Sequence, residues 1–286
     1  AAITGLSTKA VAIIIGILSG ILLWIGKYKI IERVFIALIL VMTLSFVITA
    51  IVIKPDLTAI LTEGLVPSVS AGNVLFVISL IGTTIVPYTL FLQSSTVQER
   101  FKGEKELKDS RFDVVFTITI CGIISVAIII TAAAAFPLGT GINDPGTMAD
   151  QLKPLLGSWA KYVFAFGIFA AGISSSMTAP LAAAYATAGA LGWEKNLRSA
   201  KFRSVWIGIL LIGIIFASLG YDPIQLIVFS QYANGLILPV IVLFLMFAMN
   251  NRKTLQGHVN SLWLNIVGWI IFAITVTLSL ISFGIF

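Results

Sequence analysis

A proline interrupts an apolar run that is long enough to span a membrane. The run covers residues 74–98, has Pro87 near its centre, and carries Thr83, Thr84 and Thr89 beside the proline. Proline has no backbone N–H, so the carbonyl group four residues earlier, that of Thr83, loses its helical partner. In lipid, such a carbonyl is tolerated only against protein, water or a bound polar species. The sequence therefore predicts a helix broken within the membrane, an arrangement with which transporters build sites for small ions or solutes.

The composition is that of a membrane protein. The 286 residues are 58% hydrophobic and 10% charged, and the mean hydropathy is +1.06, whereas soluble domains carry about 25% charged residues. Apolar runs reach or approach the length of roughly 20 residues that crosses a bilayer. We expect an all-α membrane protein, one transmembrane domain over residues 1–286, with eight helices at about 9–26, 31–53, 74–98, 114–136, 162–191, 204–219, 223–249 and 262–286.

The basic residues alternate between the two sides of the predicted membrane. Every second connection is basic, and together these connections hold 14 of the 18 Lys and Arg residues. The opposite side holds only Lys9, Lys54, Lys153 and Lys161. Because basic loops stay in the cytoplasm, both chain ends are predicted to be non-cytoplasmic, in a cell (inner) membrane. The chain starts outside without an export signal, so we expect it to be the carboxy-terminal part of a longer protein.

The broken run offers oxygen ligands to a cation. The first half-helix ends near Val86, and its carboxyl end carries partial negative charge from unpaired carbonyl groups. The three threonine hydroxyls and the Tyr88 phenol add further oxygens, which are hard ligands suited to Mg, Ca or Mn. The alternative is a simple proline kink in which the threonine hydroxyls bond back to their own helix.

Two other spans carry polar patches. Three serines and a threonine precede Pro180 in the fifth span: Ser174, Ser175, Ser176 and Thr178. They either line a pathway or join helices by hydrogen bonds, and joining is slightly favoured. In the seventh span, two amides three residues apart share one helical face and either present oxygens to an ion or pack: Gln231 and Asn234. Three glycines of the fifth span predict close helix packing: Gly167, Gly172 and Gly189.

The spans lack charged side chains well inside them. A dehydrated dication without a carboxylate partner would be severely penalised, so either the ion keeps much of its water or a charged ligand comes from elsewhere in the protein. His258 is predicted to be a surface residue, and the segment 144–146, Asp-Pro-Gly, to be a turn in an external loop. The single Cys121 excludes a disulfide framework. A nucleic-acid partner is not expected, because the sequence has no basic cluster interleaved with aromatic residues.

These segments resemble the NRAMP family of divalent-metal transporters, which have the LeuT-type fold of two inverted five-helix repeats. The resemblance covers essentially the whole chain as the family's fourth to eleventh helices, which implies an incomplete first repeat. It rests on an entry loop, the broken sixth helix and its cytoplasmic exit, and the eighth and tenth helices, at residues 55–68, 82–94, 97–100, 171–178 and 230–239.

The departures from the family bear on the ion. The family's sixth helix has Met-Pro-His, where the methionine sulfur contacts the metal; here these positions are Val86 and Tyr88, and a second family histidine is Gln93. Losing the thioether removes a soft ligand, a pattern similar to the NRAMP-related magnesium-transporter branch. The resemblance does not imply proton coupling, because both histidines are replaced. The family's Asp-Pro-Gly-Asn metal site lies on a first helix that this chain lacks.

The resemblance implies a secondary transporter or facilitator that imports divalent cations of the Mn, Fe and Mg class by alternating access. The Thr83 carbonyl would bind the ion, Val86 would form a selectivity wall, Tyr88 would be a polar neighbour, and Gln231 and Asn234 would complete the shell. The ion is the substrate, no cofactor is expected, and no oligomeric state follows. Alternatives are a LeuT-type carrier of an amino acid or other organic solute, and a fragment that does not transport alone. An intramembrane enzyme is disfavoured, since HExxH and GxSxG patterns are absent.

Overall fold

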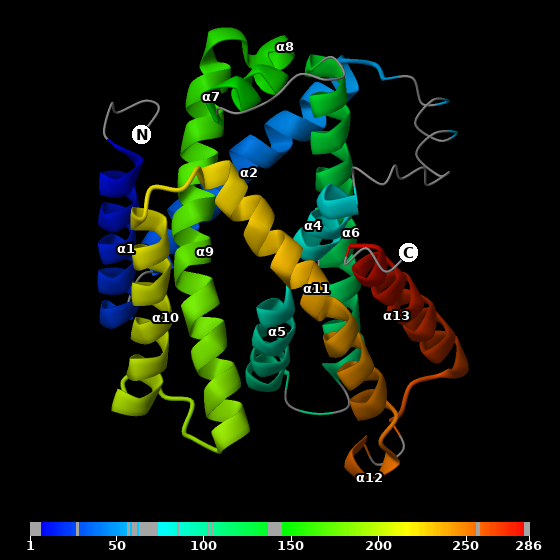
Figure 1. Cartoon of the computed structure of the whole chain (residues 1–286). Helices are drawn as coiled ribbons and strands as arrows, with labels where there is room; N and C mark the ends of the chain where they lie inside the picture. The colour runs from blue at the N-terminus through cyan, green and yellow to red at the C-terminus, as the bar shows by residue number, and fades with distance from the viewer. Residues whose placement is uncertain are drawn as a thin grey trace. The chain divides into compact units, whose positions relative to one another are not determined.

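Helices account for the regular structure of the described residues, with no strand among them (Figure 1). The computed structural model describes residues 7–26, 29–55, 58, 62, 74–84, 86–101, 103, 106–136, 145–255 and 258–282. The long helices are α1 (Thr8–Ile25), α2 (Lys29–Val52), α4 (Val74–Thr84), α5 (Pro87–Arg100), α6 (Leu107–Ala135), α9 (Ala160–Leu191), α10 (Ala200–Ser218), α11 (Pro223–Met249) and α13 (Leu262–Ser282). Short elements are α7 (Pro145–Met148), η3 (Ala149–Leu152), α8 (Lys153–Leu156), η4 (Gly157–Trp159) and α12 (Arg252–Leu255).

Eight candidate membrane spans among the described residues, taking α4 and α5 together as one, confirm the predicted all-α membrane protein. The largest difference in a boundary is at α6, which begins at Leu107 rather than at residue 114. Charged residues such as Asp109 and Arg111 ended the apolar pattern there, but they are compatible with a helix that continues beyond the apolar layer. The predicted end of the last span, 283–286, and most of the entry loop at 55–68 lie outside the described residues.

The described chain forms two compact units. Unit 1 comprises residues 1–66 and 92–220, and unit 2 comprises residues 67–91 and 221–286. The prediction of one transmembrane domain over the whole chain stays a prediction.

Unit 1 is built around α9, which packs against α1 and α10 on one part of its length and against α2 and η3 on another (Figure 1). The first contact buries one apolar cluster, in which the rings of Tyr185 and Phe202 meet edge to face at 5.1 Å. Its buried members are Leu22, Leu23, Ile173, Met177, Ala184, Ala188, Phe202 and Trp206. The second cluster comprises Phe46, Ala149, Leu152, Ala160 and Phe164. Small residues among the bulky ones let these helices approach closely.

Hydrogen bonds between helices add to this packing. The hydroxyl oxygens of Ser19 in α1 and Ser176 in α9 lie 2.6 Å apart, and Ser19 is fully buried. For Ser176, the prediction that the polar patch joins helices is therefore confirmed. Gly167 also packs as predicted, since a Cβ there would lie 2.3 Å from the Met42 sulfur. A Cβ at Gly172 or at the third predicted glycine would meet no described atom within 4 Å, so close packing was wrong for those two: Gly172 and Gly189.

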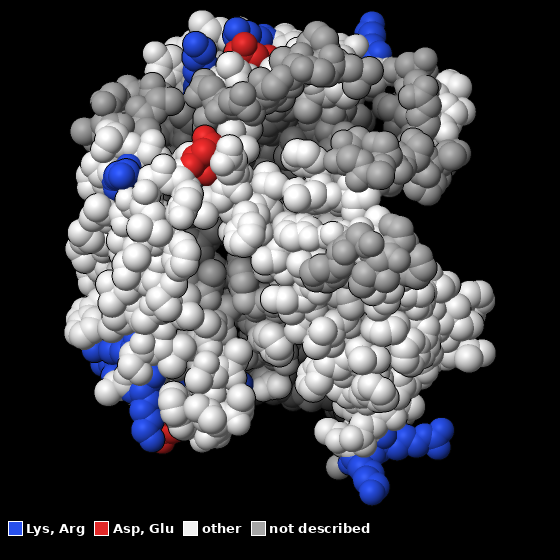
Figure 2. Space-filling view, viewed as in Figure 1, with Lys and Arg blue, Asp and Glu red and all other residues white. Residues whose placement is uncertain are grey.

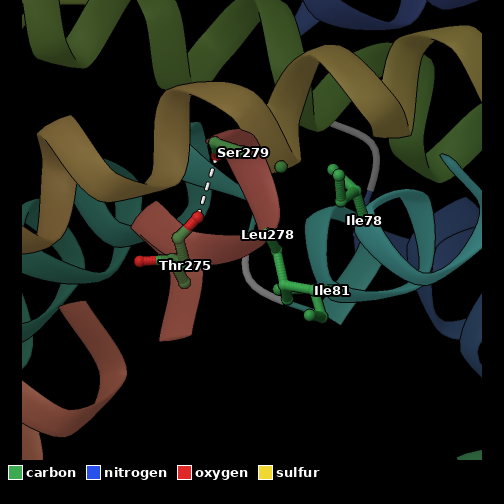
Figure 3. A pocket seen from close by; sticks show the side chains of 6 residues that line it. Ile78, Ile81, Thr275, Leu278 and Ser279 are labelled. Atoms are coloured by element: carbon green, nitrogen blue, oxygen red, sulfur yellow. Dashed lines mark hydrogen bonds between the residues drawn. The ribbon is translucent and has the colours of Figure 1, made fainter. Parts of the chain in front are cut away.

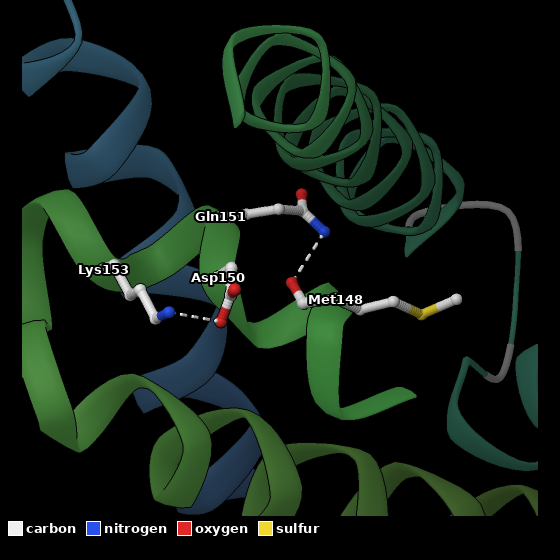
Figure 4. Close-up of polar contacts among 4 residues, drawn as sticks. All are labelled: Met148, Asp150, Gln151 and Lys153. Carbon is white, nitrogen blue, oxygen red and sulfur yellow. Dashed lines mark hydrogen bonds and ion pairs between the residues drawn. The ribbon is translucent and has the colours of Figure 1, made fainter. Parts of the chain in front are cut away.

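The segment after α6 corrects one prediction. Pro145 and Gly146 were expected to form a turn, but they begin helix α7, followed by η3 and α8; Asp144 lies outside the described residues. Proline is favourable in the first turn of a helix because its missing N–H has no partner to lose there. Figure 4 shows the contacts that hold the segment: Gln151 donates to the Met148 carbonyl at 3.0 Å, and Lys153 pairs with Asp150 at 3.0 Å.

Unit 2 is formed by α4, α11 and α13, with α11 packed against both other helices (Figure 1). Helix α11 is continuous although Pro239 lies inside it. Its carboxyl end is tied to the start of α13 by a reciprocal amide pair, in which Asn250 donates to Asn265 at 2.8 Å and Asn265 donates to Asn250 at 2.9 Å.

The surface of both units exposes many large apolar side chains, and Figure 2 shows broad areas without charged residues. Large side chains such as Trp263 and Phe112 are 76% and 70% exposed. On a protein in water such patches would drive association, whereas lipid solvates them. Lys and Arg gather at the end of unit 1 where α9 is joined to α10, and again over α12 of unit 2. In unit 1, Arg203 lies over the Trp24 ring at 3.9 Å.

Candidate cation site

The helix predicted to be broken at Pro87 is broken. Helix α4 ends at Thr84, α5 begins at Pro87, and Val86 lies between them outside either helix; Ile85 is outside the described residues. The new helix starts with two bonds to one acceptor: the Thr89 N–H donates to the Val86 carbonyl at 3.0 Å, and the Thr89 hydroxyl donates to it at 2.6 Å. The Val86 carbonyl is therefore engaged by the chain itself.

The Thr83 carbonyl, unlike that of Val86, has no helical hydrogen-bond donor. Its partner in a continuous helix would be the N–H of residue 87, and proline has none. Thr83 is exposed, and its hydroxyl makes no hydrogen bond to any residue that the structure describes. The hydroxyl of Thr84, by contrast, donates to the Leu80 carbonyl at 2.9 Å. Of the three threonines, Thr84 and Thr89 bond back to backbone as the kink alternative expects, and Thr83 does not.

Helix α4 crosses α11 at backbone contact just before the break. A Cβ built on Gly82 would lie 2.0 Å from the Gln231 carbonyl oxygen and 2.6 Å from the Gly235 nitrogen. A Cβ on Gly235 would lie 2.5 Å from the Ile78 carbonyl oxygen. Each helix thus has a glycine where the other presents backbone, and neither position accommodates a side chain. The crossing sets the Gln231 backbone against the residue that precedes Thr83.

The two amides of α11 are joined to each other. The Asn234 amide nitrogen donates to the Gln231 side-chain oxygen at 3.0 Å, and both residues are partly buried. This bond uses one amide hydrogen of Asn234 and one lone pair of Gln231, and it leaves the Asn234 oxygen and a second lone pair of Gln231 as acceptors. This hydrogen bond holds the two side chains together. Gln231 and Asn234 thus share one face of α11, as their three-residue spacing predicted.

Val86 and Tyr88, the other two predicted site residues, have no described contact that connects them to the amide pair. Val86 and Tyr88 are both partly buried, and Tyr88 is the second residue of α5. The contacts among the described residues join the broken helix to the amide pair through Gly82; they do not join Val86 or Tyr88 to it. The roles of Val86, as a selectivity wall, and of Tyr88, as a polar neighbour, stay predictions.

Helix α13 packs against both α4 and α11 beside their crossing. Figure 3 shows Ile78 and Ile81 of α4 with Leu278 of α13 around a pocket whose volume is about 10 Å³, close to the space of a single water molecule. The hydroxyls that border it are already engaged, since Thr275 donates to the Ile271 carbonyl at 2.9 Å and Ser279 to the Thr275 carbonyl at 2.9 Å. The space beside the crossing is therefore occupied by apolar packing.

The ligand set is neutral oxygen. No group of three or more His, Cys, Asp or Glu side chains suited to a metal occurs among the described residues. What unit 2 offers is a carbonyl without a helical partner, the carboxyl end of a helix, and amide oxygens. Such ligands suit a hard cation that keeps part of its water.

Sequence reasoning missed the two residues that assemble this arrangement, Gly82 and Gly235. Small residues at helix crossings are a known signal in membrane helices. The signal was usable, because Gly82 directly precedes the threonine pair and Gly235 directly follows the amide pair. Which glycine meets which backbone, however, depends on how two helices far apart in the sequence cross.

Comparisons with known proteins agree with this architecture. A family model described as natural resistance-associated macrophage protein-like matches residues 1–284. The divalent metal cation transporter MntH of Klebsiella pneumoniae strain 342 is 30% identical over 285 residues, which cover 97% of this chain and 68% of the transporter. MntH of Klebsiella pneumoniae subsp. pneumoniae strain ATCC 700721 / MGH 78578 matches with the same identity and the same coverage. With a family model that spans almost its whole length, the chain belongs to the NRAMP family.

Proposed function

We propose that this integral membrane protein transports divalent metal cations by alternating access, with the cation bound at the break between α4 and α5. The observation that carries the proposal is the contact of the broken helix with α11, which brings the residue before Thr83 against the backbone of the amide pair. A membrane helix that ends at mid-span exposes carbonyl oxygens that only a polar species satisfies. In a family whose relatives include transporters named for divalent metal cations, that species is the transported ion.

In this proposal the Thr83 carbonyl is a direct ligand, and the Asn234 amide oxygen and the second lone pair of the Gln231 amide oxygen complete the shell in part of the transport cycle. Neutral oxygens alone do not compensate the loss of all the water around a dication, so the ion keeps water at the remaining positions. The cation is the substrate and not a resident cofactor. We place the basic connections in the cytoplasm, following the distribution of Lys and Arg, and we propose that the cation moves inward across the cell membrane.

Selectivity is proposed to depend on Val86. An aliphatic side chain next to the carbonyl ligand supplies no soft donor, so hard cations such as Mg²⁺ and Mn²⁺ are preferred over Cd²⁺. A carrier of an amino acid or other organic solute, the alternative that the LeuT-type fold leaves open, is not favoured, since both relatives are named for divalent metal cations.

Uptake of Mg²⁺, Mn²⁺ and Cd²⁺ into proteoliposomes holding the protein tests the proposal. We expect uptake of the first two and weak uptake of Cd²⁺. The Val86→Met variant adds a thioether and should raise Cd²⁺ uptake relative to Mg²⁺ by about tenfold, the equivalent of ~1.4 kcal/mol of added ion affinity. Ile237→Met adds the same group at an exposed position of α11 and should leave the ratio unchanged. A strong Cd²⁺ preference of the unaltered protein would contradict the hard-ion assignment.

A further inference from the structure

Unit 1 contains a cavity of its own, separate from the residues of the break. It lies between the first turns of α2 and the middle of α9 and has a volume of about 250 Å³. Glu32 contributes a carboxylate from α2, and Ser174 and Thr178 contribute hydroxyls from α9. The serine patch of α9 is thus divided between two roles: Ser176 joins helices, while its neighbours line a cavity.

The polar lining of the cavity is made of oxygen atoms. Ser174 and Thr178 are one helical turn apart and so share a face of α9. The Thr178 hydroxyl donates to the Ser174 carbonyl at 2.8 Å, which uses its proton and leaves its oxygen as an acceptor. No Lys or Arg is among the described residues that line the cavity, and apolar side chains, Met177 and Phe35 among them, form the rest of its wall. A carboxylate with hydroxyl acceptors beside it is suited to a hard positive ligand.

The Glu32 carboxylate forms no ion pair with any residue in the described part of the chain. An acidic residue in the first turn of a helix interacts favourably with the helix dipole, and that interaction accounts for a glutamate at this end of α2. It does not account for a cavity of this size or for the hydroxyls of α9 on its other wall. Arg33 and the basic connections make this end of the helix repulsive to cations, and Glu32 provides the local attraction that a passing cation needs.

The volume fits a hydrated ion rather than a bare one. A cavity of this size has room for several water molecules. A divalent cation with six waters therefore fits, and Glu32 can hold it through its water shell. Mg²⁺ in particular keeps several waters and binds through one or two carboxylates.

We propose that this cavity is a second cation station, which binds a hydrated divalent cation through Glu32, Ser174 and Thr178 on the cytoplasmic side of the protein. The proposal deepens the proposed function and rests on it for the identity of the ligand. The station is distinct from the break in its chemistry: it uses a carboxylate and an intact water shell, whereas the break uses neutral oxygens close to the ion.

Equilibrium binding of Mn²⁺ to the purified protein, followed by the loss of the free-ion electron paramagnetic resonance signal, tests the station. Glu32→Gln should weaken one class of bound Mn²⁺ by tenfold or more, and Glu32→Asp should retain most of its affinity. Thr178→Val should weaken the same class less. Glu194→Gln is the matched control, because it removes an exposed carboxylate that does not line the cavity. An unchanged Mn²⁺ isotherm for Glu32→Gln would overturn the proposal.

Mn²⁺ uptake by the same variants separates this proposal from the proposed function. If the unaltered protein transports Mn²⁺ and Glu32→Gln binds Mn²⁺ as Glu194→Gln does, the station fails while the transport function holds. If no divalent cation is transported but Glu32→Gln loses Mn²⁺ binding, the transport function fails while the station holds. Glu32 is exposed at the start of α2, so its substitution is not expected to impair folding, which size-exclusion elution of each variant verifies.

Discussion

Helix α9 and the pair α4–α5 each carry a proline within a membrane span, yet only the second is interrupted. Pro180 lies inside the continuous helix Ala160–Leu191, whereas Pro87 separates α4 from α5. Both prolines remove one backbone hydrogen bond, from the carbonyl of Ser176 in α9 and from that of Thr83 in α4. The loss of this bond is therefore not what decides whether a helix breaks.

The surroundings of the two prolines differ. Pro180 is buried, and its neighbours Met177 and Ala184 belong to the apolar cluster that α9 shares with α1 and α10. Pro87 is only partly buried, and Thr83, one turn before it, is exposed. Packing on several sides holds a helix straight through a proline whose intrinsic cost is about 3 kcal/mol. Where that packing is absent on one face, the chain departs from the helix and its carbonyl is left to a ligand.

The largest effect is expected from adding one methyl group at the crossing next to the break. Gly82→Ala places a Cβ against the backbone of Gln231, which cannot move aside as a side chain would. We expect a loss of about 1–3 kcal/mol of stability and transport at background level. The matched control is Gly172→Ala in α9, where a Cβ meets no described atom within 4 Å. Uptake rates and thermal unfolding of both variants check this prediction. Similar losses in both variants would contradict the requirement for close backbone contact at Gly82.

A smaller effect is expected from restoring the missing donor. Pro87→Ala supplies an N–H to the Thr83 carbonyl, so the two half-helices can join and the carbonyl is withdrawn from the ion. Divalent-cation uptake should fall about tenfold, the equivalent of ~1.4 kcal/mol. The same change in α9, Pro180→Ala, adds a bond to a helix that is already continuous and should alter uptake less than twofold. Initial uptake rates at a subsaturating cation concentration measure both, and equal effects would contradict the distinction between the two prolines.

The smallest effect concerns the hydrogen bond that joins α1 to α9. Ser19→Ala, Ser176→Ala and the double variant form a cycle whose coupling energy should be about 0.6 kcal/mol, the average for interhelical hydrogen bonds in membranes. Transport should be unchanged, since neither hydroxyl lines the cavity of unit 1 or belongs to the break. Ser218, whose hydroxyl bonds only to the Ile215 carbonyl in its own helix, serves in a control cycle with Ser176. The free energy of unfolding of each variant in detergent gives both coupling energies. Equal coupling energies in the two cycles would refute a specific hydrogen bond between Ser19 and Ser176.

Much of the fold was predictable, because a membrane imposes one simple rule on a chain. A segment of apolar residues long enough to cross lipid must be helical, so all eight spans were identified and only their ends were misplaced. The ends of the helices depend on helix propensity and capping outside the apolar layer. At Leu107, for example, the polarity of the residues does not predict where α6 begins. Short helices such as α7 were missed for a related reason: Pro-Gly favours a turn in isolation but also suits the first turn of a helix.

The candidate site was predictable only in part. The break at Pro87 and the shared face of Gln231 and Asn234 follow from local chemistry, namely a missing N–H and a helical period. The sequence by itself determined that the Thr83 carbonyl lacks a helical partner, because residue 87 is a proline. Only the tertiary structure decided that Gly82 and Gly235 bring two distant helices into backbone contact, and that Ser174 and Thr178 face Glu32 across a cavity. The physical reason is that helix crossings are set by close packing between surfaces distant in sequence, which no local pattern encodes.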